Sequence, residues 1–121
     1  MPVFNAAAAA RVIADAHARR ETYANLSGLL EPPTIADAYA VQEALLPLWG
    51  PTRGPIAGLK IATTTKVMQQ LMGIDHPCGG MIYEGTVHSS PHELVLSQHM
   101  HVVVECELAV RLDRDLAAKG S

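Results

Sequence analysis

Cysteine and aromatic residues are scarce in this sequence. Only 4% of its residues are aromatic, and it holds two cysteines, Cys78 and Cys106. Two cysteines cannot form a disulfide framework. In a reducing compartment a free cysteine is most often a small, buried, apolar residue rather than a catalytic one. We therefore expect no disulfide scaffold and assign neither thiol a catalytic role.

Basic clusters and long apolar runs are also missing. The 9 Lys and Arg residues are outnumbered by 12 Asp and Glu residues, and no basic cluster exceeds the pair Arg19 and Arg20. Such a chain lacks the basic surface that nucleic-acid binding requires. No apolar run approaches the roughly 20 residues that cross a bilayer, and the first ten residues do not resemble a signal peptide. We expect a cytoplasmic protein with no nucleic-acid partner and no membrane partner.

Two helices are predicted in the first half of the chain. The alanine-rich stretch from Asn5 to Arg20 has high helix propensity, with Asn5 as its N-cap. Thr34, followed three residues later by Asp37, predicts the start of a second, amphipathic helix. We expect glycine and proline at positions 50 and 51 to end it.

Short elements and one long strand are predicted in the second half. An irregular connection over residues 51–58 leads to a short apolar segment at 59–62, and a helix follows over residues 66–72 with Thr65 as its N-cap. A brief strand is predicted at 81–83. Residues 101–112 alternate between apolar and mixed positions, which makes them the clearest strand of the chain.

These elements predict an α+β fold in a single, partial domain. With 121 residues the chain can bury one core but not two. Residues 1–50 would form a helical region and residues 51–121 the start of a β-rich region. A long strand with few partners is an aggregation hazard at an exposed edge. We therefore expect a fragment of a longer fold, with a covering subunit in a homo-oligomer as the alternative.

Glu105 and Glu107 are the first candidates for a metal site. Two residues apart on a strand, they leave the same face with Cα atoms roughly 6 to 7 Å apart. Two carboxylates at that spacing can bind one hard divalent cation. The pair alone fits a solvated polar face better, but the apolar neighbours Val103 and Ala109 on the same face argue against simple exposure.

Histidines suggest a second kind of metal site. The spacing of His99, His101 and Glu105 resembles the first metal motif of the cupins, although Glu93 and Leu112 stand where that motif has glycine. Ordinary loop histidines remain the simpler interpretation for most of this group. Five of the six histidines lie in one region: His76, His88, His92, His99 and His101.

Two further residues are candidates for proton transfer or substrate binding. Lys60 lies among apolar residues and is either an exposed strand charge or a partly buried electrophile for a carboxylate or oxo group. Asp75 precedes a His-Pro pair, where an aspartate commonly initiates a turn. Neither residue is decisive by itself.

Three motifs in a fixed order resemble one family. GLKIATTTKVMQQLMGIDHP, then GGMIY, then VECELAVRLDRDL are similar to segments of the 2-keto-4-pentenoate hydratases and 4-oxalocrotonate decarboxylases, within the fumarylacetoacetate hydrolase superfamily. The resemblance covers roughly residues 34 to 116. It implies the start of a fumarylacetoacetate-hydrolase-like, β-rich fold.

The resemblance also implies a metal-dependent site. Glu105 and Glu107 match the first two of three acidic ligands for Mg²⁺ or Mn²⁺, and the third lies beyond Ser121 in the longer members of the family. Lys60 and Asp75 match residues of the catalytic site, and Thr65 stands where the family has a substrate-binding serine. Because two carboxylates hold Mg²⁺ weakly, we expect this chain alone to be inactive.

The function implied is hydration of a small 2-oxo acid. A hydratase of this kind adds water to 2-hydroxypenta-2,4-dienoate-like compounds and gives 4-hydroxy-2-oxo acids, in the degradation of aromatic compounds. A metal-dependent decarboxylase or an acylpyruvate-type hydrolase of the same superfamily is the nearest alternative. A non-catalytic remnant or interaction module, or a cupin-like metal protein, are alternatives from other classes.

Overall fold

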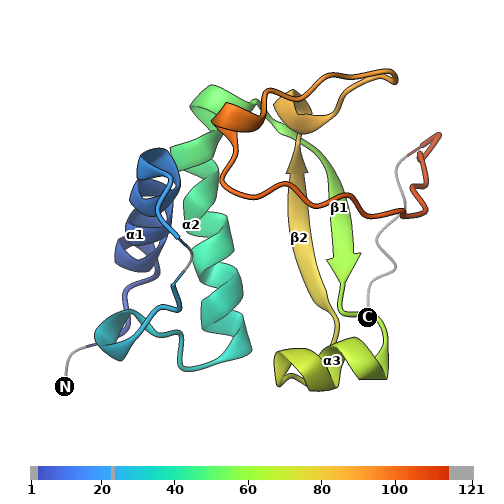
Figure 1. The fold of residues 1–121 in the computed structure, drawn as a ribbon. Coiled ribbons are helices and arrows are strands. Elements are labelled where there is room, and N and C mark those ends of the chain that lie inside the picture. The colour runs from blue at the N-terminus through green and yellow to red at the C-terminus, as the bar shows by residue number, and fades with distance from the viewer. Residues whose placement is uncertain (1–2, 23, 115–121) are drawn as a thin grey trace.

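The computed structural model describes residues 3–22 and 24–114. The helices are α1 (Ala6–Arg19), α2 (Ile35–Arg53) and α3 (Lys66–Met72), and the strands are β1 (Ile56–Ala62) and β2 (Cys78–Tyr83). Three short 3-10 turns lie at Gly28–Leu30, Glu84–Thr86 and Leu96–Gln98. Figure 1 shows α1 beside α2, the two strands next to α2, and α3 at the far end of the strand pair. The mixture of helices and strands agrees with the predicted α+β class.

Local capping explains where the helices begin. The Asn5 side chain accepts a hydrogen bond from the Ala8 N–H at the start of α1. Thr34 Oγ1 accepts from the Asp37 N–H at 3.1 Å and donates to the Asp37 carboxylate at 2.6 Å. These bonds satisfy backbone donors that the first helical turn leaves free. The predicted N-caps of both helices are thus confirmed.

Helix α2 ends later than the sequence predicts. Position 50 does not stop it, because α2 continues through Pro51 to Arg53. The Gly54 N–H donates to Gly50 O at 2.9 Å, and Thr52 Oγ1 donates to Trp49 O at 3.1 Å, so the last turn stays hydrogen-bonded. A proline removes one backbone donor, which this turn tolerates. The predicted irregular connection over 51–58 is therefore wrong.

The core lies between the two long helices. Ala9 and Ala10 of α1 are fully buried against Val41 and Leu45 of α2. Alanine leaves room for the helix axes to approach closely, and partly buried aliphatic and aromatic residues surround the contact. The predicted packing face of α2 is met only in part: Leu45 is buried as expected, but Ile35 and Tyr39 on the predicted face are exposed, and Val41 is buried instead.

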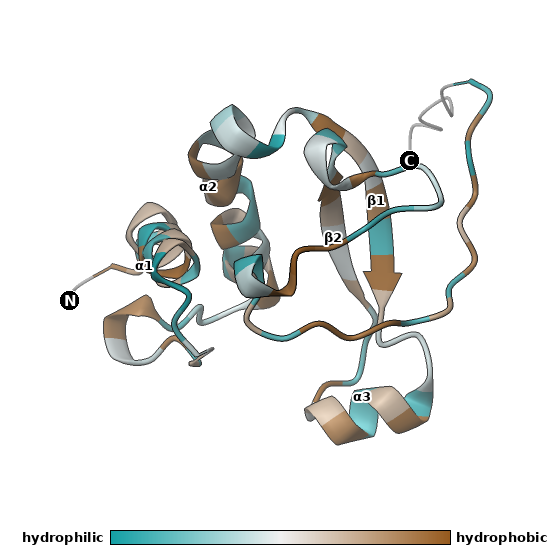
Figure 2. Cartoon of the chain, turned by 45° about the horizontal axis from the view of Figure 1, so that its top comes forward, coloured by the Kyte–Doolittle hydropathy of each residue, from teal (hydrophilic) through white to brown (hydrophobic). Residues whose placement is uncertain are grey.

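Strands β1 and β2 form an antiparallel, two-stranded sheet. Their register pairs Leu59 with Met81, Lys60 with Gly80 and Ala62 with Cys78. Both strands are longer than the sequence predicts, since β1 starts at Ile56 and β2 at Cys78. Many apolar side chains of β1 and α3 are exposed, and Figure 2 shows the brown segments that carry them. The described residues supply no third strand for this sheet.

The long strand predicted over residues 101–112 is not formed. This segment has no strand structure, and its side chains are exposed, with Leu108 fully so. A strand exists only when a neighbour completes its ladder of hydrogen bonds, and within residues 3–22 and 24–114 no strand pairs with this segment. Correspondingly, Cys106 is exposed rather than buried.

Membrane-spanning helices were searched for in the same residues. None of the helices in the described part of the chain has the length and apolarity needed to cross a bilayer.

Candidate functional site

Three of the predicted site residues lie on the elements at the α3 end of the strand pair. Lys60 lies near the end of β1, Thr65 precedes α3, and Asp75 lies in the loop that leads from α3 into β2. Figure 1 shows α3 and the adjoining ends of β1 and β2 at the same edge of the molecule. The motif that carries these residues therefore folds into one local unit.

Lys60 lies on the sheet opposite a glycine. Its cross-strand partner is Gly80, and a Cβ atom at Gly80 would lie 3.3 Å from Lys60 Cγ. The lysine stem therefore lies across the strand in the space that the missing side chain leaves. Lys60 is exposed and forms no ion pair with the described residues. Of its two interpretations, the exposed strand charge is the one that the structure shows.

Thr65 and Asp75 differ in how firmly they are held. Thr65 Oγ1 accepts a hydrogen bond from the Met68 N–H at 3.3 Å, which confirms its predicted role as N-cap of α3. The Asp75 side chain is exposed and has no hydrogen-bond partner in the described chain. Helix α3 ends at Gly73, which adopts a left-handed conformation with φ 70°. Asp75 therefore presents its carboxylate to solvent from a fixed turn.

Glu105 and Glu107 do not belong to this local unit. They lie further along the chain, in a segment that forms neither helix nor strand. Both are exposed in the segment without strand structure, and neither forms an ion pair within the described residues. Carboxylate oxygens are the ligands that Mg²⁺ and Mn²⁺ prefer. Residues 3–22 and 24–114 contain no group of three His, Cys, Asp or Glu side chains able to hold a metal ion. The pair fits the ion in ligand type, and further ligands would have to complete the site.

The histidine-rich region does not assemble a cupin-like centre in the described chain. The His88 and His92 rings stack with centroids 3.8 Å apart and planes 4° apart. His99 and His101 lie further along, in or next to the segment without strand structure. The predicted motif of His99, His101 and Glu105 therefore lacks the strand that would place its ligands on one face.

The larger of the two clefts described here includes in its lining Ile74 and His76, the residues on either side of Asp75, but not Asp75 itself. Its volume is about 760 Å³, and it lies between α2, the loop before α2, and the start of β2. The Tyr39 hydroxyl accepts from the Gly79 N–H at 2.9 Å, and Gln42 Nε2 donates to Gly79 O at 2.8 Å. None of the five predicted site residues lines this cleft. Its polar lining residues include Tyr39, Gln42, His76 and Cys78.

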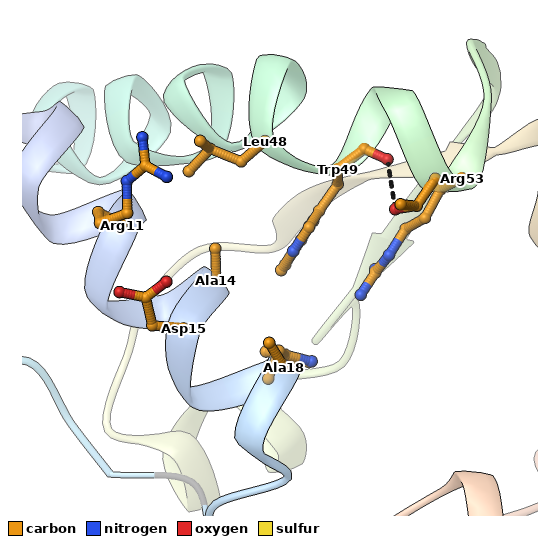
Figure 3. Close-up of a pocket in the computed structure, with 9 residues that line it drawn as sticks. Arg11, Ala14, Asp15, Ala18, Leu48, Trp49 and Arg53 are labelled. Carbon is orange, nitrogen blue, oxygen red and sulfur yellow. Dashed lines mark hydrogen bonds between the residues drawn. The ribbon is translucent and has the colours of Figure 1, made fainter.

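The second cleft lies between α1 and α2. It has a volume of about 340 Å³, and Figure 3 shows side chains that line it, among them Arg11, Ala14 and Asp15 from α1 and Leu48, Trp49 and Arg53 from α2. The Arg53 guanidinium stacks over the Trp49 ring, with Cζ 4.0 Å from the ring centroid. This cleft contains no residue that the sequence singled out for function.

Comparison with known proteins points to one group of enzymes. The chain is 28% identical over 105 residues to a 2-keto-4-pentenoate hydratase of Paraburkholderia phymatum. The matched segment covers 87% of this chain and 40% of that protein. It is 30% identical to a TodF product hydratase of Pseudomonas putida over 73% of this chain and 33% of that protein. A 2-keto-4-pentenoate hydratase 1 of Dechloromonas aromatica is also 30% identical, over 76% of this chain and 36% of that protein.

The similarity is confined to part of each relative. The chain spans between 31% and 40% of the length of the curated relatives it matches. Such coverage is consistent with an N-terminal portion. No protein-family model and no solved structure matches the chain.

Proposed function

We propose that this chain, a relative of the 2-keto-4-pentenoate hydratases over about a third of their length, contributes to hydration of 2-hydroxypenta-2,4-dienoate-like acids. The products would be 4-hydroxy-2-oxo acids, formed in the degradation of aromatic compounds. The observation that supports this most is the local unit at the α3 end of the strand pair. There one continuous stretch of sequence presents Lys60, Thr65 and Asp75 from a strand end, a helix start and a turn.

Each of these three side chains has a chemical role that suits a small 2-oxo acid. The exposed Lys60 ammonium is a compact cation able to bind the carboxylate or donate a proton to the oxo group. The Asp75 carboxylate, which no described residue binds, is able to accept and return a proton. The Thr65 hydroxyl already caps α3, so it would offer its proton to the substrate while its oxygen accepts from Met68.

We propose Mg²⁺ or Mn²⁺ as the cofactor, held by Glu105 and Glu107 together with ligands from outside the described residues. When bound, the ion would act as a Lewis acid that stabilises developing negative charge on a 2-oxo acid. Further subunits of a homo-oligomer are one source of the missing ligands. Exposed apolar side chains on β1 and α3, including Leu59, Ile61 and Leu71, favour such an association.

The function is tested in a chimera, because the chain matches only part of its relatives. This chain would replace the matching 105-residue segment of the Paraburkholderia phymatum hydratase. Hydration is followed as loss of the dienol absorbance of 2-hydroxypenta-2,4-dienoate in the presence of Mn²⁺. We expect Lys60→Met to lower the rate by about 100-fold or more, as loss of a proton donor typically does.

Lys66→Met is the matched control, since Lys66 is an exposed lysine at the start of α3. It should leave the rate unchanged. A folded chimera that does not hydrate the dienoate contradicts the proposal, as does one in which both lysine variants behave alike. A chimera that leaves the dienoate unchanged but releases CO₂ from a 2-oxo diacid such as 4-oxalocrotonate would assign the decarboxylase function.

A further inference from the structure

The turn between β1 and α3 contains a strained residue. Thr63 has φ 54°, in the left-handed region. A β-branched residue is rarely found there, because its side chain crowds the backbone. Such a conformation persists only where surrounding interactions hold it, and it is frequent at functional sites. Neighbouring hydrogen bonds must therefore hold Thr63 in this conformation.

Gln69 supplies a side-chain hydrogen bond to the main chain of Thr63. Its side chain is 5% exposed, and Nε2 donates to Thr63 O at 2.9 Å. The other amide atom, Oε1, is buried without a hydrogen-bond partner. Leaving an acceptor unpaired in this way costs free energy. The neighbouring Gln70 is exposed and makes no side-chain hydrogen bond in the described chain, so burial is specific to position 69.

Thr63 in turn forms a hydrogen bond with the start of β2. Its Oγ1 accepts from the Cys78 N–H at 3.1 Å, donates to Ala62 O at 2.7 Å, and lies 3.5 Å from His76 O. The last rung of the sheet pairs Ala62 with Cys78 at the same place. The strained turn thus joins the end of β1, which carries Lys60, to the loop that follows Asp75.

The loop is held on its other side as well. The Ile74 N–H donates to the main-chain oxygen of Gln69 at 2.9 Å. Asp75 therefore lies between two restrained neighbours, Ile74 bonded to Gln69 and His76 in contact with Thr63. Its own side chain has no partner in the described residues, so these neighbours are what fix it.

We propose that Gln69 is a positioning residue: its buried amide holds Thr63 in the left-handed conformation and so fixes Asp75 relative to Lys60. The importance of that geometry rests on the proposed hydratase function. The hydrogen bond from Gln69 to Thr63 is a property of the fold, and its effect is measurable without any enzyme assay.

The test compares Gln69→Met with Gln70→Met in the full chain by NMR. The methionine side chain has nearly the same shape as glutamine but cannot donate a hydrogen bond to Thr63 O. It also has no strong acceptor that burial would leave unpaired, so the variant should fold. We expect the Cys78 amide to exchange with solvent about fivefold faster or more, as loss of one net hydrogen bond implies. The HN–Hα coupling of Thr63 should change to an extended-backbone value, and the Asp75 amide should exchange faster.

A rescue variant distinguishes release of the strained backbone at position 63 from a general loss of stability. Asparagine tolerates the left-handed region better than threonine does, so Thr63→Asn combined with Gln69→Met should restore the left-handed coupling at position 63. Amides of α1 and α2 should be unaffected in every variant. Unchanged Cys78 and Asp75 exchange in Gln69→Met overturns the proposal, and so does equal acceleration in Gln70→Met. Failure of the hydration chimera would leave this result standing, which keeps the two proposals distinguishable.

Discussion

Among the described glycines, Gly85 is the one whose replacement would create the closest contact with neighbouring backbone, and replacing it gives a sharp prediction. The turn Glu84–Thr86 packs against the end of α2. A Cβ atom at Gly85 would lie 2.7 Å from Arg53 O and 3.3 Å from Arg53 C. Both atoms belong to the backbone, so no side-chain rotation relieves the contact. Gly85→Ala must therefore shift the turn or the last turn of α2.

The size of the effect follows from this overlap. Forcing one additional carbon into a tightly packed contact costs about 1–3 kcal/mol. The same shift would disturb the Glu84 N–H, which donates to Pro55 O at 2.8 Å. It would also move Arg53 away from Trp49, over whose ring the Arg53 Cζ now lies at 4.0 Å. We expect Gly85→Ala to lower the free energy of unfolding by about 2 kcal/mol.

Urea unfolding followed by fluorescence measures this, because the chain has a single tryptophan, Trp49, beside the altered contact. Gly58→Ala is the matched control: its Cβ would meet only Ile82 Cδ1, at 3.9 Å. That substitution should keep or slightly raise stability, since alanine loses less backbone entropy than glycine on folding. A Gly85→Ala variant as stable as Gly58→Ala would refute the close packing of Gly85 against the Arg53 backbone.

Three further substitutions test the packing, the capping and the surface charges. Leu45→Ala should lower the free energy of unfolding by about 2–5 kcal/mol, because Leu45 is one of the few buried side chains between α1 and α2; urea titration measures it. Thr34→Ala should cost about 1 kcal/mol through loss of the N-cap to Asp37, and loss of helical circular dichroism should accompany it. Arg19 holds the pKa of Glu21 below its usual range through a hydrogen bond, so the pair's contribution exists at neutral pH and disappears as the pH falls through that lowered pKa. Because both side chains are exposed, that contribution is small, and Glu21→Gln should lower the free energy of unfolding at pH 7 only slightly in the same urea titration.

Features that depend on neighbouring residues in sequence are the ones that the sequence predicts correctly. Asn5, Thr34 and Thr65 cap their helices as predicted, because a cap needs only the next few residues. Lys60 lies on a strand and Asp75 in a turn for the same reason. For both residues, the neighbouring residues of the motif determine the local secondary structure.

Features that depend on distant partners are predicted less well. The apolar alternation over residues 101–112 indicates a strand, but it carries no information about which strand would complete the ladder. Helix α2 passes through Pro51 because hydrogen bonds of its last turn compensate for the missing donor. Neither outcome follows from periodicity or from residue preferences alone.

Two parts of the candidate site were also missed by sequence reasoning. The left-handed Thr63 and the buried Gln69 have no signature in a run of threonines and glutamines, since either residue type is usually exposed. Tyr39 and Gln42, three residues apart on one face of α2, gave a usable signal for the larger cleft. That spacing shows that both side chains lie together, whereas their contact with Gly79 depends on the fold.

The central claim is that Lys60, Asp75, Glu105 and Glu107 serve one metal-dependent site, and paramagnetic broadening by Mn²⁺ tests it directly. Mn²⁺ would be titrated into the isotope-labelled chimera described above, so that ligands from outside this chain can be present, together with 2-oxopentanoate, an unreactive 2-oxo acid, while amide signals are followed. We predict broadening at Cys106, between the two glutamates, and at Asp75 and Gly80, with loss of both effects in Glu107→Gln. Broadening centred on His88 and His92, or the same pattern in Glu107→Gln, would contradict the account.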